Sequence, residues 1–188
     1  MPFKFLKKKV PKRFDVVGFD RYPVSQYIPM NKILRDRLYR EYDGSATLPS
    51  YGSYEKHIRP ELLMLMQDFR LKFIFGEDSF DMLIKKGTIW DGSSVPSLLE
   101  FGKVKRMSQY SLIASLVHDT NFSNAYFSFE EANEIFEGLL YFNEADNFTV
   151  FVHMLGLKLF GRSRYNKAAK LGKLVGFSTL KRVNLEDL

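Results

Sequence analysis

The strongest constraint on the fold is a change in hydrophobic periodicity along the chain. Residues 69–75 and 80–84 are apolar, strand-like runs on either side of a turn at 76–79, which predicts an antiparallel hairpin. From residue 108 onward, the apolar residues recur at steps of three and four, which predicts helices. We therefore expect an α+β fold in which a small antiparallel sheet packs on a three-helix layer.

The three helices have recognisable starts. The first is expected over residues 108–122 with Ser108 as its N-cap, and the second begins at Ser128, which forms the capping-box pattern with Glu131. The third starts at residue 146 or 147, and its apolar spacing runs until Gly161, after which a basic stretch is expected to be partly helical. Its apolar stripe consists of Phe148, Phe151, Val152, Leu155 and Leu159.

The segment before the hairpin is less regular. Apolar residues at helical spacing predict a short helix over 31–42, followed by a polar loop that continues through Tyr54. Residues 61–66 fit either a helix starting at Pro60 or a buried strand that leads into the hairpin.

Charge divides the 188-residue chain into three parts. Residues 1–13 carry six Lys and Arg and no acid, residues 14–146 carry fourteen against twenty acids, and residues 147–185 carry eight against none. Two basic ends around an acidic middle suggest an acidic partner, such as nucleic acid, an anionic membrane surface or another subunit, although Lys-rich ends also simply aid solubility. No apolar run approaches the roughly 20 residues that cross a bilayer.

The first thirty residues are expected to form an extended arm, because they contain four prolines and no helical period. Six aromatic residues are too many for a solvated tail, so the arm should dock on its own domain or on a neighbouring subunit. The expected organisation is an arm over 1–30, a single α+β domain over 31–165, and a basic C-terminal tail over 166–188 that becomes irregular at its end. The residues expected to bind a partner are Phe3, Phe5, Phe14, Phe19, Tyr22, Lys7, Lys8, Lys9, Arg162 and Arg164.

The chain's Asp, Ser and His residues gather in two short motifs. Residues 90–96 (WDGSSVP) predict a strand end that breaks into a polar turn at Gly92, and His118 and Asp119 lie in the last turns of the first predicted helix. Asp91, His118 and Asp119 could orient a water or bind a divalent metal for hydrolysis. Since the chain has no cysteine, any metal would need such ligands. In the alternative interpretation, Asp91 caps the turn and accepts a hydrogen bond from His118, forming a buried clasp between sheet and helix.

Two further histidines are expected to have ordinary surface or core roles. His57 lies in a polar loop, and His153 lies beside the apolar stripe of the third helix.

Residues 84–161 resemble a small domain-of-unknown-function family of tailed bacteriophages, prophages and some bacteria. The matching motifs, in order, are Asp91 to Pro96, His118-Asp119, Ala132 to Phe136, and Val152 to Gly156. Two positions depart from the family pattern, because Trp90 replaces a Thr and Asn133 replaces an Asp. Asparagine is a poorer metal ligand than a carboxylate and cannot act as a general base near neutral pH.

The resemblance implies a tailed-bacteriophage virion or morphogenesis component, assembled in the host cytoplasm and located in the virion. Such a protein would dock on other virion subunits through its arm and basic tail, within a hetero- or homo-oligomeric assembly, and its basic ends could contact DNA. This role implies neither enzymatic activity nor a cofactor. The alternative is a metal-assisted hydrolase that acts on cell-wall material with a divalent metal at His118, Asp91 and Asp119.

Overall fold

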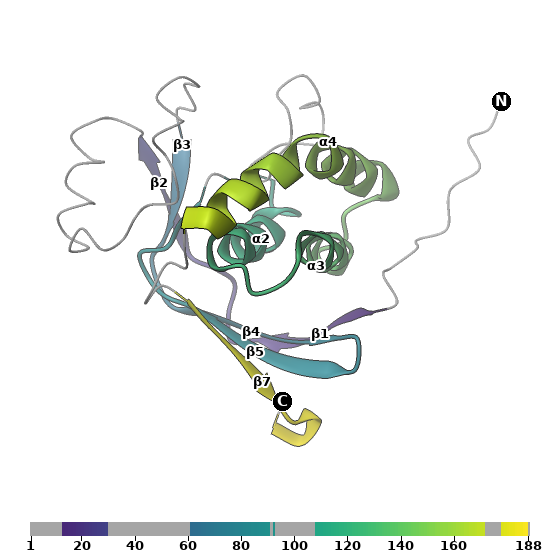
Figure 1. The fold of residues 1–188 in the computed structure, drawn as a ribbon. Coiled ribbons are helices and arrows are strands. Elements are labelled where there is room, and N and C mark those ends of the chain that lie inside the picture. Colours follow the sequence, from purple (N-terminus) through teal and green to yellow (C-terminus); the bar gives the residue numbers. More distant parts are fainter. Residues whose placement is uncertain (1–12, 30–60, 91, 93–107, 172–177, 188) are drawn as a thin grey trace.

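A computed structural model of the chain describes residues 13–29, 61–90, 92, 108–171 and 178–187 (Figure 1). Within these ranges, three helices and two antiparallel sheets, one of four strands and one of three, pack together. The expected α+β fold class is therefore confirmed. The helix expected over 31–42 and the residues His57 and Asp91 lie outside the described ranges.

The four-stranded sheet is built around the predicted hairpin, which is confirmed. Strands β4 (Phe69–Phe75) and β5 (Asp78–Ile84) pair in antiparallel register, with Phe75 opposite Asp78 and Phe69 opposite Ile84. Alternate residues of β4 are buried, as a sheet with one face on the core requires. The buried set is Phe69, Leu71, Phe73 and Phe75.

The edge strands of this sheet come from the two ends of the chain. Strand β1 (Phe14–Phe19) pairs with β4, and strand β7 (Ser178–Val183) pairs with β5. The expected boundaries at residues 30 and 165 therefore do not separate an arm and a tail from the sheet. The tail is not irregular either, since β7 is followed by a short 3-10 helix, η3 (Leu185–Asp187). Both end segments cover edges that the hairpin alone would leave unpaired.

The three-stranded sheet shows which interpretation of residues 61–66 is correct. Strand β3 (Glu61–Leu65) lies between β2 (Ser25–Pro29) and β6 (Ile89–Trp90), so the strand interpretation of this segment is confirmed and the helix interpretation is wrong. Strand β2, like β1, belongs to the predicted arm. The described residues of the arm therefore form strands of the domain itself. Strand β6 ends at Trp90, where the first motif begins, as predicted.

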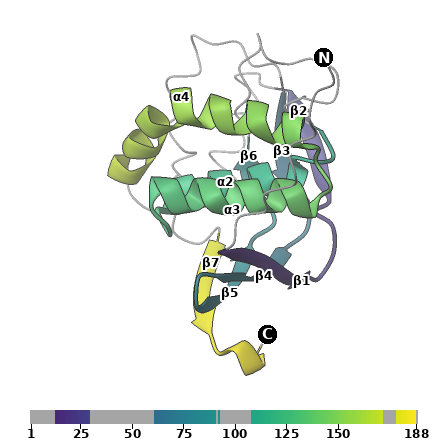
Figure 2. The same cartoon turned by 90° about the vertical axis from the view of Figure 1, so that its right-hand side faces the viewer.

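Helix α2 (Leu112–Asn124) and helix α3 (Phe129–Phe142) lie between the four-stranded sheet and helix α4 (Asn147–Leu171), as both views show (Figures 1 and 2). The capping box of α3 is confirmed. Helix α2 starts later than expected, with Ser111 and not Ser108 at its N-cap. Helix α4 continues ten residues beyond Gly161, into the basic stretch that was expected to be partly helical. None of the described helices combines the length and apolar composition that crossing a membrane requires.

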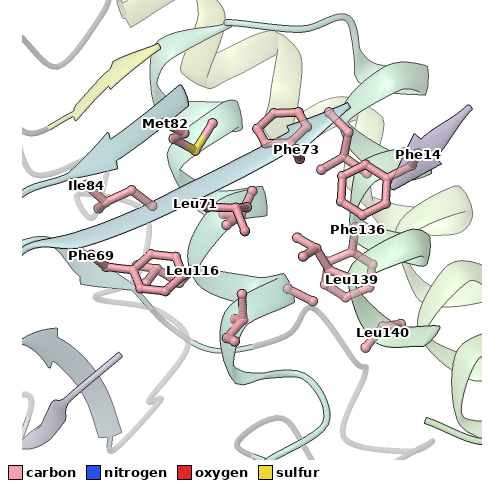
Figure 3. Close-up of a cluster of buried hydrophobic side chains, with 14 of the residues drawn as sticks. Phe14, Phe69, Leu71, Phe73, Met82, Ile84, Leu116, Phe136, Leu139 and Leu140 are labelled. Carbon is pink, nitrogen blue, oxygen red and sulfur yellow. The ribbon is translucent and has the colours of Figure 1, made fainter. Parts of the chain in front are cut away.

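The core lies where the four-stranded sheet meets α2 and α3 (Figure 3). Phe14 of β1 belongs to it, with its ring centroid 5.6 Å from that of Phe73. A Cβ added to Gly138 of α3 would lie 2.1 Å from Phe14 Cδ1, so a glycine lets the strand approach the helix. Phe14 is thus buried in its own domain and presents little surface to a partner.

The apolar stripe of the third helix does not form one buried face. Val152 is buried, but Phe148, Phe151 and Leu159 are more than half exposed. The face that packs on α2 and α3 carries different residues: Val150, His153, Leu157 and Gly161. Periodicity alone could not orient this helix, because apolar residues occur on nearly all its faces.

Candidate functional site

His118 is the centre of the candidate site, and it is buried between two helices. Helix α2 directs its imidazole toward α3, where Nε2 lies 3.1 Å from Oδ1 of Asn133 and only 2% of the residue is exposed. An amide oxygen only accepts hydrogen bonds, so His118 Nε2 is the donor in this arrangement. Asn133, one of the two positions that depart from the family pattern, is therefore the hydrogen-bond partner of His118.

Aromatic rings enclose the same imidazole. The ring centroid of His118 lies 4.0 Å from that of Phe122 and 5.0 Å from that of Phe136. Phe122 in turn packs on Phe129 and Tyr165, which joins α2 to α3 and α4. The imidazole thus contributes to packing between helices as well as to a hydrogen bond.

Asp119 contacts His118 only loosely. Its Oδ1 lies 3.7 Å from His118 Nδ1, which is beyond hydrogen-bond distance, and its side chain is about one quarter exposed. The structure brings these two predicted site residues together, while the third, Asp91, lies outside the described residues. The predicted hydrogen bond between His118 and Asp91 is therefore untested.

Within the described residues, Trp90 of the first motif contacts α2, the helix that carries His118 and Asp119. Trp90 is fully buried, and its Nε1 donates a hydrogen bond to Ser115 Oγ of α2 at 3.2 Å. Gly92 follows with a φ of 77°, an unusual backbone conformation that glycine adopts readily, as was expected for this residue. Sequence reasoning missed Ser115, because no local signal links it to Trp90 across 25 residues.

His153 is a second buried imidazole near this site. Its Nδ1 donates to the Thr149 carbonyl at 2.8 Å, and its ring centroid lies 6.0 Å from that of Phe136, which also contacts His118. Burial lowers the pKa of His153 below its usual value, and the hydrogen bond to Thr149 partly offsets this effect. The expected core role of His153 agrees with this placement.

The remaining candidate residues lie in several places. Phe19 packs on Phe69 and Phe142, whereas Tyr22 is exposed beside it. Arg162 is exposed, pairs with Glu130 and lies over the Phe129 ring. The candidates outside the described residues or side chains are Phe3, Phe5, Lys7, Lys8, Lys9 and Arg164.

The described geometry defines what this site can do chemically. His118 donates to an amide that cannot accept a proton, and both groups lie between helices. Among residues with described positions, no three His, Asp or Glu side chains gather closely enough to hold a metal ion. The described part of the site thus has the features of a polar contact within a core.

The chain was compared with protein-family models, with curated proteins and with solved structures. The chain matches no protein-family model, no curated protein and no solved structure. The resemblance to the phage family remains a prediction from its motifs.

Proposed function

We propose that this protein is a tailed-bacteriophage virion or morphogenesis component with a role in assembly. The observation that carries the proposal is the enclosure of His118, whose Nε2 is held by Asn133 and whose ring packs against Phe122 and Phe136. This enclosure supports a structural role for His118, one of the three residues that suggested catalysis. The phage setting comes from the sequence resemblance.

Surface features of the described residues support an assembly role. Apolar side chains are exposed on α4 and beside β1, including Phe151, Leu159 and Tyr22. Exposed apolar surface of this kind often marks contacts between proteins. In the proposed assembly, these surfaces and the basic ends contact other virion subunits, and the basic ends contact DNA.

The metal-assisted hydrolase is the competing proposal, and Asp91 is the residue on which it depends. Only His118 and Asp119 of its three ligands have described positions, and a metal site needs at least three protein ligands around one point. If the hydrolase proposal is correct, purified protein should release soluble fragments from cell-wall material, and a chelator should abolish this activity.

Particle composition tests the assembly proposal directly. The gene is disrupted in the phage or prophage that carries it, and the particles made with and without a plasmid copy are compared by quantitative mass spectrometry and electron microscopy. We expect the protein to be present in particles or in assembly intermediates, and we expect incomplete particles in its absence. Normal, infectious particles without the protein would refute the proposal.

The variant Asp119→Asn separates the two proposals. It removes the carboxylate beside His118 but leaves the contact between His118 and Asn133 in place. An assembly protein should complement the disruption with this variant as well as with the wild type, whereas a hydrolase that uses Asp119 should lose its activity.

A further inference from the structure

Three aromatic rings gather on the surface where the end of β1 meets the end of α3, and we call this cluster the Tyr22 patch. Phe19, the last residue of β1, lies at its centre. Its ring centroid is 5.0 Å from that of Tyr22 and 5.9 Å from that of Phe142, and both contacts are edge-to-face. Tyr22 is 67% exposed and Phe142 is 44% exposed, so two of the three rings present apolar surface to solvent. Exposed aromatic rings that lie together are typical of a contact surface.

The core of the domain holds the Tyr22 patch in place. The ring of Phe19 also packs on that of Phe69, which is fully buried, with 6.4 Å between the centroids. The next residue, Asp20, donates its backbone N–H to the carbonyl of Arg70 at 3.3 Å. A contact surface that is already formed loses little conformational entropy when a partner binds, which favours binding.

The two segments that carry the patch are acidic. Residues 15–26 and 138–146 contain four acidic residues and a single basic one, Arg21. The four acids, all of them exposed, are Asp15, Asp20, Glu144 and Asp146. Arg21 donates to Gln67 Oε1 at 2.9 Å, and the charge of the neighbouring Arg70 is paired with Asp81. A partner for this patch should therefore combine apolar rings with positive charge.

A segment with this combination precedes β1 in the same chain. Residues 1–12, which lie outside the described ranges, contain five lysines and no acidic residue. They also contain Phe3 and Phe5, whose spacing of two would place both rings on one side of an extended chain, about 7 Å apart. Aromatic rings in contact have centroids about 4.5–7 Å apart, so two neighbouring rings of the patch can each receive one of these phenylalanines.

Charge distinguishes the Tyr22 patch from the exposed rings of α4. Phe151 is 61% exposed and Phe160 is 56% exposed, but residues 147–171 contain five basic residues and no acidic one. A lysine-rich segment would be repelled by that helix and attracted by the patch.

The direction of β1 favours a neighbouring copy over the same chain as the site for residues 1–12. Strand β1 has six residues, so its start at Phe14 lies about 17 Å from Phe19 and the patch. Arg13 is held at that far end, because its carbonyl accepts from Gly76 N–H at 2.6 Å and its guanidinium lies over the Phe75 ring. To reach its own patch, the chain before Arg13 would have to reverse its direction, whereas a second copy can present its patch without any reversal.

We propose that residues 1–12 of one copy dock on the Tyr22 patch of the next copy, with Phe3 and Phe5 against its rings and the lysines beside its acids. Because the segment and the patch are different surfaces, this contact is head-to-tail and can join several copies into a ring or a filament. The proposal rests on the proposed assembly role and names a second copy as one partner. It is measured on purified protein, so its failure would leave the particle experiment above unaffected.

Two complementary double variants test the head-to-tail contact by sedimentation. Phe3→Ala with Phe5→Ala removes the rings of the segment, and Tyr22→Ala with Phe142→Ala removes the exposed rings of the patch. We expect the wild type to form concentration-dependent species heavier than the 22.0 kDa chain, and each double variant alone to stay monomeric. A mixture of the two variants should form a dimer and nothing larger, because only one intact segment and one intact patch remain to be joined.

A fluorescently labelled peptide of residues 1–12 measures the contact directly through its anisotropy. The receiving protein is the whole chain with Phe3→Ala and Phe5→Ala, whose own segment does not compete. Binding should be saturable and should weaken by about tenfold or more when Tyr22→Ala and Phe142→Ala are added. Asp20→Lys with Glu144→Lys changes two exposed positions and should weaken binding as well, as should raising the salt concentration from about 0.05 M to about 0.5 M.

Phe151→Ala with Phe160→Ala is the matched control, because it removes two exposed rings from a helix without acids. It should leave the affinity for the peptide unchanged, and circular dichroism should show that every variant is folded. Three results would each overturn the proposal: no binding up to about 500 μM peptide, equal binding of a peptide with Phe3→Ala and Phe5→Ala, or a wild type that stays monomeric up to about 200 μM. The last result would mean that residues 1–12 dock within their own chain or on a different protein.

Discussion

Helices α2 and α4 are both rich in apolar residues, yet the protein uses them in opposite ways. Helix α2 lies between the four-stranded sheet and α4, and ten of its thirteen residues are buried, polar ones included. Helix α4 packs with one side only and leaves Phe151 and Leu159 exposed. The difference shows that the layer in which a helix lies, more than its composition, decides whether its residues stabilise the fold or face a partner.

The largest expected effect on the free energy of unfolding comes from making the same substitution in both helices. Leu116→Ala in α2 removes a fully buried side chain and should lower the free energy of unfolding by about 2–5 kcal/mol. Leu159→Ala in α4 removes an exposed side chain and should change it by less than about 0.5 kcal/mol. Urea denaturation of both variants, at a concentration where the chain is monomeric, measures the difference. Equal losses would show that Leu159 is part of the core.

A smaller effect is expected at the contact between α2 and α3. Asn133→Ala leaves His118 Nε2 without its acceptor in a buried place, which should lower the free energy of unfolding by about 1–3 kcal/mol. Asn133→Asp restores an oxygen acceptor and should recover most of the loss at neutral pH. Chemical denaturation of both variants measures the effect. If Asn133→Ala unfolds like the wild type, the hydrogen bond does not contribute to stability.

The pH dependence of stability should include a contribution from His153. Burial lowers its pKa in the folded state, so below the ordinary value of 6.5 the unfolded chain takes up a proton that the folded chain does not. This contribution is complete above about pH 6.5 and is lost as the pH falls below it. Unfolding of the wild type and of His153→Gln between pH 8 and pH 5 measures it. The variant should lose less stability on acidification, and an unchanged pH profile would contradict this assignment.

Local signals predicted the parts of the fold that depend on neighbouring residues. The β4–β5 hairpin needs only a turn between two apolar runs, and the capping box of α3 needs only Ser128 and Glu131. Strands β1 and β7 could not be predicted in this way, because each pairs with residues about 50 to 100 positions away. Their pairing is decided by the open edges of the hairpin.

The candidate site was predictable in part. The motifs identified His118 and Asp119 and marked Asn133 as unusual, but the contact between His118 and Asn133 depends on how α2 packs against α3. The same limit explains the error in α4. An apolar stripe at helical spacing does not show whether the core or a partner will cover it, because both bury the same kind of side chain.

Two variants compared in one complementation experiment test the central claim. The claim is that the motif around His118 stabilises the fold, whereas the exposed apolar residues of α4 contact other subunits. The disrupted phage or prophage is complemented with Asp119→Asn or with the double variant Phe151→Asp and Leu159→Asp, and the amount of protein in purified particles is measured. We predict wild-type incorporation of Asp119→Asn and strongly reduced incorporation of the double variant, with both proteins folded. The reverse result, in which Asp119→Asn abolishes function and the double variant is incorporated normally, would contradict the account.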